Sequence, residues 1–204
     1  MTPERDTSAK KSIRHLFLGD SYTIGQGVAA DKRWPSQLTD SLKARGVSVE
    51  ASRVIAKTGW TVAGLLNGIR EGNPDSSWTH VSILIGVNNQ YQRRPVKEFL
   101  MGLDTLLLQA RRFTPTGTIY LLTIPDYSYT PFAGRDSLRI RSEIEQYNRE
   151  IRQAAVDRQL ILIDVTTVSK SAGKDPSLLA DDRLHPSGKQ YQVWVDSVLK
   201  RVRF

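Results

Sequence analysis

The sequence predicts one α/β domain, built on a parallel sheet with helices on both faces. Short apolar runs alternate along the chain with longer segments in which apolar residues recur at helical spacing, and this alternation occurs five times. Strands that alternate with helices pair in parallel, because each helix carries the chain back to the same end of the sheet. The 204 residues suit one domain with one large core, and no repeat or linker divides them.

The first half of the chain is expected to supply two strands and two helices. The apolar run 13–18 indicates a strand, and the apolar residues of 34–42 recur every fourth position, as in a helix. Segment 47–55 indicates a second, weaker strand. Segment 62–69 has apolar residues at i, i+3, i+4 and i+7, which predicts a helix with one buried face.

The middle of the chain continues the alternation. Segment 81–85 contains only apolar and small residues, as expected for a strand that is buried on both faces. Segment 96–110 is the clearest amphipathic helix of the sequence, and 118–123 indicates the next strand.

The last third is expected to complete the sheet and to carry long loops. Segment 140–155 predicts a long helix, 160–165 the fifth strand and 191–202 the closing helix. The longest irregular stretches are 123–135 and 166–184, and loops of that length in a compact domain are usually functional. Sites in open parallel sheets form beyond the carboxyl ends of the strands, so those ends are where chemistry is expected.

Composition narrows the functional classes. The chain has no cysteine, which excludes disulfides and thiolate metal sites. Residues 1–12 are polar and are expected to form a flexible N-terminus ahead of a single domain over 13–204. We find no signal peptide or membrane-spanning segment, so the cytoplasm is the expected location, and a periplasmic one stays open for a chain whose leader was removed. The sequence gives no indication of oligomeric state.

The net charge of +8 does not predict nucleic-acid binding. The basic residues occur as scattered pairs with acids between them, and no basic run is interleaved with aromatic residues. A solvated basic surface is expected instead, one that could attract anionic substrates.

Gly19, Asp20 and Ser21 follow the first predicted strand. A glycine allows a sharp turn there, which would present the serine hydroxyl at the edge of the sheet. A nucleophilic serine needs a base, and the base needs an orienting partner. Asp182 lies three residues before His185, so its carboxylate could fold back onto the imidazole. Each motif alone also fits an ordinary turn or cap.

Two further motifs could supply hydrogen-bond donors to an oxyanion. Gly86 and Asn88 follow the central strand, and an asparagine amide can donate to a developing negative charge. Gly59 follows the second strand and could offer its backbone N–H. Ordinary turn chemistry is the alternative for both. The Gly-x-Ser-x-Gly elbow of the α/β-hydrolases is absent, which disfavours that fold.

Taken together, these motifs resemble the four blocks of the SGNH (GDSL) hydrolase family, in its order and at its usual separations. The resemblance extends from about residue 13 to the C-terminus. It implies a three-layer α/β/α, flavodoxin-like fold with a five-stranded parallel sheet, and hydrolysis of esters and thioesters without a cofactor.

The resemblance also implies a role for each motif residue. Ser21 would be the nucleophile and would donate its backbone N–H to the oxyanion, together with Gly59 N–H and the Asn88 side chain. His185 would be the general base, oriented by Asp182. Many family members have Asp after the Gly-x-Asn motif, whereas this chain has Asn89, a position expected to support the loop.

The expected function is a serine esterase that hydrolyses small acyl esters, acetyl groups on carbohydrate among them. The small-molecule ester is the only expected partner, with no nucleic acid and no membrane insertion. We favour small acyl groups because we see no amphipathic lid or membrane-binding helix. A lysophospholipase, a thioesterase or an acyltransferase on the same site stays open, as does a catalytically silent binding module.

Aromatic residues in loops after predicted strands could line the substrate pocket. Trp60, Tyr91 and Tyr127 are the candidates for substrate binding, and Tyr129 and Phe132 lie in the same loops. Core packing beneath the long loops is the alternative for each of them.

No metal site is expected. Asp181, Asp182 and His185 lie close together, but the sequence does not gather further ligands near them. His15 and His80 belong to the opposite edge of the predicted sheet, so we interpret both as structural.

Overall fold

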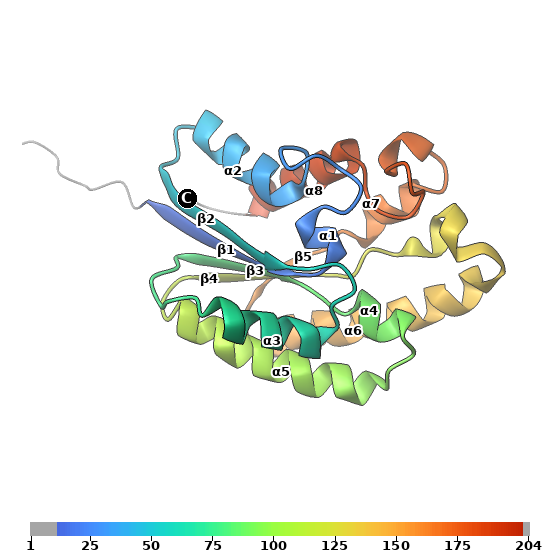
Figure 1. Cartoon of the computed structure of the whole chain (residues 1–204), viewed down its shortest axis with the longest axis horizontal. Coiled ribbons are helices and arrows are strands. Elements are labelled where there is room, and N and C mark those ends of the chain that lie inside the picture. Colours follow the sequence, from blue (N-terminus) through green and yellow to red (C-terminus); the bar gives the residue numbers. More distant parts are fainter. Residues whose placement is uncertain (1–11, 202–204) are drawn as a thin grey trace, which may run out of the picture.

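The computed structural model describes residues 12–201, which form a central parallel sheet between two layers of helices (Figure 1). The strands pair in the order β2-β1-β3-β4-β5, and every pair is parallel. They are β1 (Ile13–Gly19), β2 (Val49–Ala56), β3 (His80–Leu84), β4 (Thr118–Leu122) and β5 (Ile161–Ile163). This is the flavodoxin-like strand order, so the predicted fold class is confirmed. The predicted N-terminal segment up to residue 11 lies outside the described residues.

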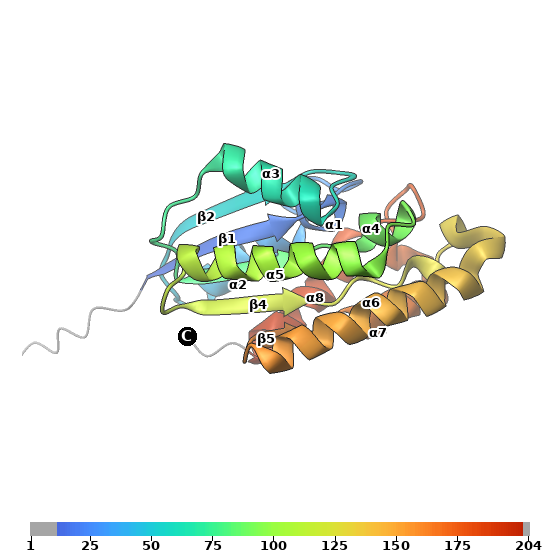
Figure 2. The ribbon, with the colours of Figure 1, turned by 90° about the horizontal axis from the view of Figure 1, so that it is seen from below.

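Helices cover both faces of the sheet (Figures 1 and 2). Helices α2 (Trp34–Ala44), α7 (Thr166–Ser171) and α8 (Gly188–Arg201) lie on one face, where α2 packs against α8. Helices α3 (Val62–Gly72), α5 (Val96–Phe113) and α6 (Ser137–Asp157) lie on the other. The predicted helices are all present, although Val202 of the closing helix lies outside the described residues.

The core is centred on β1, which has a neighbouring strand on each side. Leu16, Phe17 and Leu18 have no exposed surface, so this strand is buried on both faces. The Phe17 ring meets Trp34 of α2 edge-on, with ring centroids 4.9 Å apart. Burying one such side chain contributes about 1.5–3 kcal/mol to stability. Because β1 is fixed in the core, the residues that follow its carboxyl end begin from a rigid position.

The fifth strand is shorter than predicted. It spans three residues, whereas the sequence predicted 160–165. It lies at the edge of the sheet and pairs with β4. Directly after it, the Asp164 carboxylate accepts a hydrogen bond from Thr166 N at 2.8 Å. That turn ends the strand and begins α7, because a side-chain acceptor replaces the next ladder bond.

Short helices occupy places where the sequence predicted loops. Helices α1 (Ser21–Ile24) and α4 (Val87–Tyr91) begin directly after β1 and after the β3 end, so Tyr91 belongs to a helix and not to a loop. The two long irregular stretches also contain helical turns, which are η1 (Tyr127–Tyr129), η2 (Pro131–Asp136), α7 and η3 (Pro176–Leu178). Elements of three to six residues are too short to display a hydrophobic period.

His15 and His80 lie opposite each other in β1 and β3, near the amino ends of these strands. His15 Nε2 lies 2.7 Å from Ser82 Oγ, and burial followed by repulsion from His80 lowers the pKa of His15. Burial lowers the pKa of His80 to about 4. Both imidazoles are therefore neutral at pH 7, at the edge of the sheet opposite the motifs.

Over residues 12–201, every helix is too short or too polar to cross a membrane.

Candidate active site

Ser21 is the first residue of α1, directly beyond the carboxyl end of β1. The turn needs a glycine at Gly19, because a Cβ atom there would lie 2.6 Å from the carbonyl oxygen of Leu84 on β3. Asp20 caps the helix by accepting a hydrogen bond from Tyr22 N at 3.0 Å. The local sequence thus places the Ser21 hydroxyl at the end of the rigid central strand. Figures 1 and 2 show α1 and α4 at this same end of the sheet.

His185 reaches the same place from the segment before α8. Its Nε2 atom lies 3.0 Å from Ser21 Oγ, within hydrogen-bond distance. The segment is braced by Ala180 N, which donates to the His185 carbonyl at 2.8 Å, and by a bridge between Leu179 and Pro186. The ring of Tyr22 packs beside the imidazole, with ring centroids 5.4 Å apart.

Asp182 fixes the other side of the imidazole. Its Oδ2 atom lies 2.6 Å from His185 Nδ1, and its Oδ1 atom accepts hydrogen bonds from the backbone N–H groups of Leu184 and His185 at 3.0 and 2.9 Å. Partial burial raises the pKa of Asp182, but the hydrogen bonds from the His185 ring and the two amides outweigh it and hold that pKa below its usual value. An ionised Asp182 can only accept a hydrogen bond, so the imidazole proton belongs on Nδ1. Nε2 is then free to receive a proton from Ser21.

Gly59 and Asn88 line the same cavity as Ser21 and His185. Gly59 has a φ of 82°, which an L-residue rarely adopts, and Asn88 is the second residue of α4. The Asn88 side chain donates one N–H to the carbonyl oxygen of Trp60 at 2.9 Å. An amide nitrogen carries two hydrogens, so this bond orients the group and leaves the second hydrogen available to a ligand.

Asn89 faces away from the cavity and joins two elements. It has no exposed surface, and its Oδ1 atom accepts a hydrogen bond from Val62 N at the start of α3, at 2.9 Å. This contact ties α4 to α3. The side chain therefore positions the backbone next to Asn88 and does not reach the reacting atoms.

The cavity above Ser21 has a volume of about 270 Å³ and a mostly apolar wall. Tyr91 and Tyr127 line it, as the sequence suggested, and so does Phe132. Four further residues in the wall were not predicted from the sequence, and they are Tyr22, Thr58, Val87 and Leu184. Each of these four is the direct neighbour of a motif residue in the sequence, and that adjacency was the signal that could have found them.

Trp60 does not line this cavity. Its ring lies on α3, over two glycines spaced one helical turn apart. A Cβ atom at Gly64 would lie only 3.0 Å from Trp60 Cδ1, and one at Gly68 would overlap the ring. The side chain therefore fixes the loop that presents Gly59, whereas the sequence had suggested that it binds substrate.

A chain of hydrogen bonds holds the Tyr127 side of the wall to α4 and α6. Tyr127 donates from its hydroxyl to Gln90 Oε1 at 2.8 Å, and Gln90 donates from Nε2 to Glu143 at 2.6 Å. Burial raises the pKa of Tyr127 to about 12, against a smaller opposing contribution from the Gln90 bond. The phenol is thus neutral and its position is fixed.

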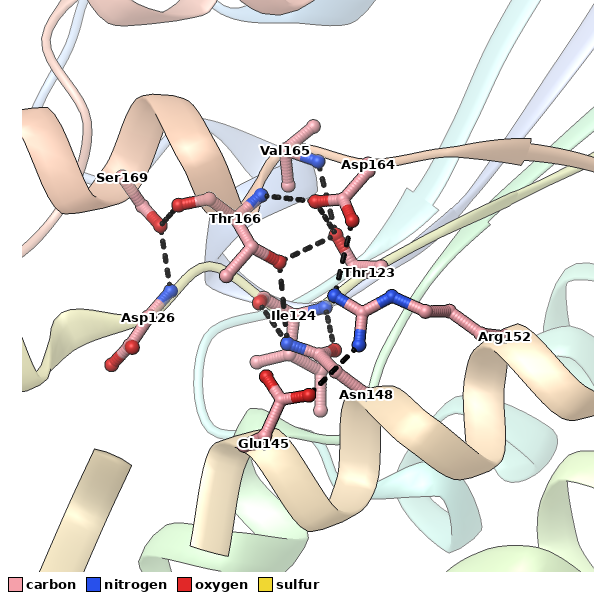
Figure 3. A network of polar contacts seen from close by, with 10 residues as sticks. All are labelled: Thr123, Ile124, Asp126, Glu145, Asn148, Arg152, Asp164, Val165, Thr166 and Ser169. Carbon is pink, nitrogen blue, oxygen red and sulfur yellow. Dashed lines mark hydrogen bonds and ion pairs between the residues drawn. The ribbon is translucent and has the colours of Figure 1, made fainter. Parts of the chain in front are cut away.

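A second polar network anchors the loop that carries Tyr127 (Figure 3). Asn148 of α6 accepts a hydrogen bond from Ile124 N at 2.7 Å and donates one to the Ile124 carbonyl at 2.9 Å. Two residues further on, Asp126 N donates to Ser169 Oγ of α7 at 2.8 Å. The Asn148 side chain thereby acts like an extra strand partner at the point where β4 ends.

Asp20 is a buried acid beside the nucleophile. Its side chain has no exposed surface, and among residues 12–201 its Oδ2 atom has no hydrogen-bond partner. Burial raises the pKa of Asp20 to about 7, against the lowering effect of the backbone hydrogen bonds to the carboxylate. A carboxyl group in this environment is protonated at mildly acidic pH, because burial penalises its charged form.

Residues 12–201 bring no three His, Cys, Asp or Glu side chains together in a geometry that could hold a metal ion. The groups above Ser21 are instead a hydroxyl, an imidazole with a carboxylate behind it, and N–H donors. This set can remove a proton from a serine and stabilise a negative oxygen.

Comparison with known proteins identifies the family and the fold of the chain. Residues 17–193 match the GDSL-like Lipase/Acylhydrolase family. The chain is 26% identical to the isoamyl acetate-hydrolyzing esterase 1 homolog of Bos taurus, with 87% of this chain and 77% of that protein covered. Among solved structures, a member of the lipolytic G-D-S-L family from Veillonella parvula superposes with a TM-score of 0.76 at 17% identity, covering 93% of this chain and 97% of the other. An acetylxylan esterase from Geobacillus stearothermophilus superposes with a TM-score of 0.72 at 23% identity, covering 96% and 97%.

Proposed function

The chain belongs to the GDSL-like lipase/acylhydrolase family, and we propose that it is a serine esterase that cleaves small acyl esters with Ser21, His185 and Asp182. One observation carries the proposal. The hydrogen bonds from Ser21 to His185 and from His185 to Asp182 form one continuous chain, which opens into an apolar cavity.

The first half of the reaction would acylate Ser21. The Oγ atom attacks the ester carbonyl carbon while its proton moves to His185 Nε2, and the Asp182 carboxylate stabilises the imidazolium that results. The negative oxygen of the tetrahedral intermediate accepts hydrogen bonds from the N–H groups of Ser21 and Gly59 and from the free N–H of Asn88. The intermediate collapses when the C–O bond to the alcohol breaks, and His185 returns the proton to the departing alcohol.

The second half would release the acid. A water molecule gives its proton to His185 Nε2 and attacks the acyl carbon, with the same donors holding the oxyanion. Collapse of this second intermediate returns the proton to Ser21 Oγ and frees the carboxylic acid. Neither half needs a cofactor, because acid–base and electrostatic catalysis supply the whole sequence.

The wall of the cavity favours short, uncharged acyl groups. Aromatic and aliphatic side chains supply most of it, and none of the described residues that line it is an acid, a lysine or an arginine. At about 270 Å³ the space is at the lower limit of pockets that hold drug-sized ligands. Acetate esters fit such a space, and two of the similar proteins are named for acetylated compounds, isoamyl acetate and acetylxylan.

A panel of p-nitrophenyl esters of graded acyl length tests the proposal. We expect hydrolysis by the native protein, fastest with the acetate or butyrate ester, and none above background by Ser21→Ala. A matched control is Ser187→Ala, which changes a serine two residues from His185 that does not line the cavity. Equal hydrolysis by native protein and Ser21→Ala would refute the mechanism. A native protein that neither hydrolyses any ester nor reacts with a serine-directed phosphonate would favour the silent binding module.

A further inference from the structure

A second cavity lies beside the one above Ser21. It has a volume of about 370 Å³ and is formed by α4, η2 and the start of α6. Three residues, Tyr91, Tyr127 and Phe132, line both cavities and therefore form the wall between them. A substrate bound at Ser21 that extends past this wall enters the second cavity.

Of the three side chains that form this wall, one is fixed in place and two are exposed to solvent. Tyr127 is buried and bonded to Gln90, whereas Tyr91 and Phe132 are 58% and 48% exposed. The Phe132 ring centroid lies 6.2 Å from each of the two tyrosine rings. The exposed rings thus present apolar faces at the mouth of both cavities, where a bound ligand could cover them.

The second cavity differs from the first in its chemistry. Its lining includes the charged side chains of Arg93, Asp136 and Arg139. Arg139 is already engaged, since its guanidinium donates to Asp136 and to Glu143. The Arg93 side chain is exposed, and within residues 12–201 its guanidinium makes no hydrogen bond or ion pair. The cavity therefore combines unused donors, a carboxylate acceptor and aromatic faces.

We propose that this second cavity is a subsite for a hydroxyl-bearing alcohol portion of the ester, such as a sugar or glycerol unit. The inference rests on the proposed esterase function and names the class of alcohol. Each hydroxyl both donates and accepts, which matches Arg93 beside the Arg139–Asp136 pair. The C–H faces of a polyol can pack on the exposed rings of Tyr91 and Phe132. An ionised phosphate has no hydrogen to donate to the Asp136 carboxylate, whereas a hydroxyl has one, so a polyol matches this lining more fully.

The test compares Arg93→Met with Arg94→Met on esters that share the acetyl group. Methionine keeps an unbranched apolar stem and removes every N–H. Arg94 is the matched control, since it carries the same charge one residue away, faces Glu98 at 3.9 Å and lines neither cavity. The substrates are ethyl acetate, glycerol monoacetate and a glucose monoacetate.

We expect Arg93→Met to raise the KM for a hydroxylated acetate about fivefold, the effect of one exposed hydrogen bond to a charged group, with kcat unchanged. Its KM for ethyl acetate should equal that of the native protein, and Arg94→Met should change neither. The response of the glycerol and glucose esters identifies which polyol the subsite holds. An equal change for all three esters, or no change for either polyol ester, overturns the inference.

A second measurement does not depend on turnover of a polyol ester. Methyl glucoside and glycerol should inhibit ethyl acetate hydrolysis competitively in the native protein and in Arg94→Met, and more weakly in Arg93→Met. Equal inhibition of all three proteins contradicts the subsite. Failure of the proposed function is distinguishable, because it would abolish the dependence of ethyl acetate hydrolysis on Ser21, whereas failure of the subsite leaves that dependence intact.

Discussion

Ser21 Oγ lies 3.0 Å from His185 Nε2, although 164 positions separate the two residues in the chain. The contact joins the carboxyl end of the central strand to the segment before the last helix. Both sides are braced independently, Ser21 by the turn at Gly19 and His185 by the Asp182 carboxylate. The pair is therefore held in place before any substrate binds.

Replacing the general base should lower kcat more than replacing the acid that orients it. We expect His185→Ala to lower kcat by about 10⁴-fold, and Asp182→Ala by about tenfold less than that, because Asp182 does not itself transfer the proton. Steady-state kinetics with p-nitrophenyl acetate measure both effects. Asp181→Ala is the matched control, since this exposed neighbouring carboxylate should be dispensable. A larger loss in Asp182→Ala than in His185→Ala would contradict the assigned roles.

Asn88 should act on the transition state more than on substrate binding. We expect Asn88→Ala to lower kcat by about 10²-fold or more with little change in KM, the usual loss when one oxyanion donor is removed. The same assay separates kcat from KM. If Asn88→Ala raised KM and left kcat unchanged, the amide would be a substrate-binding group and not an oxyanion donor.

Asp20 should make stability depend on pH. The folded protein keeps the Asp20 proton up to about pH 7, whereas the unfolded chain releases it near 3.8. The folded state therefore binds more protons between these values, and the contribution of Asp20 to stability falls as the pH rises through this window, by about 4 kcal/mol at most. Asp20→Asn keeps the acceptor for Tyr22 N and removes the titration.

Urea unfolding at pH 5 and pH 8 measures this effect. We expect Asp20→Asn to be more stable relative to the native protein at pH 8 than at pH 5, so that the free energy of unfolding of the variant minus that of the native protein is larger at pH 8. Comparing variant with native at each pH cancels the contribution of His15 and His80, which the substitution leaves in place. A difference between the two proteins that is the same at both pH values would show that Asp20 does not titrate in this range.

Asn148 should be needed for stability. Asn148→Ala leaves the N–H and C=O of Ile124 without their partners in a buried position, which costs about 2–4 kcal/mol. Urea unfolding at one pH measures the loss. Gln153→Ala is the matched control, because its side chain lies on the same helix and is exposed. Similar stabilities for the two variants would mean that the network in Figure 3 does not anchor the loop.

The order of the motifs was enough to predict where Ser21 and His185 lie. Parallel strands place their carboxyl ends at one edge, so segments that follow different strands meet there whatever their separation in sequence. Burial and polar bonds at that edge were not predictable in the same way. The full burial of Asp20 and the link from Gln90 to Glu143, 53 positions away, depend on tertiary packing that no local pattern records.

The orientation of Trp60 was also not predictable from the local sequence. The sequence places it beside Gly59, and an aromatic residue there suggested contact with substrate. The two glycines on α3 leave a groove that the indole ring fills, so the ring turns away from the cavity. Conversely, Tyr22 and Leu184 line the cavity because the backbone that fixes Ser21 and His185 also fixes their neighbours.

The central claim is that Ser21 is the nucleophile, and labelling with a serine-directed phosphonate tests it most directly. Intact-mass and peptide mass spectrometry would locate the adduct after the native protein has lost its esterase activity. We predict a single adduct on Ser21, its absence from Ser21→Ala, and much slower labelling of His185→Ala. An adduct on another residue, with Ser21 unmodified and activity lost, would contradict the mechanism.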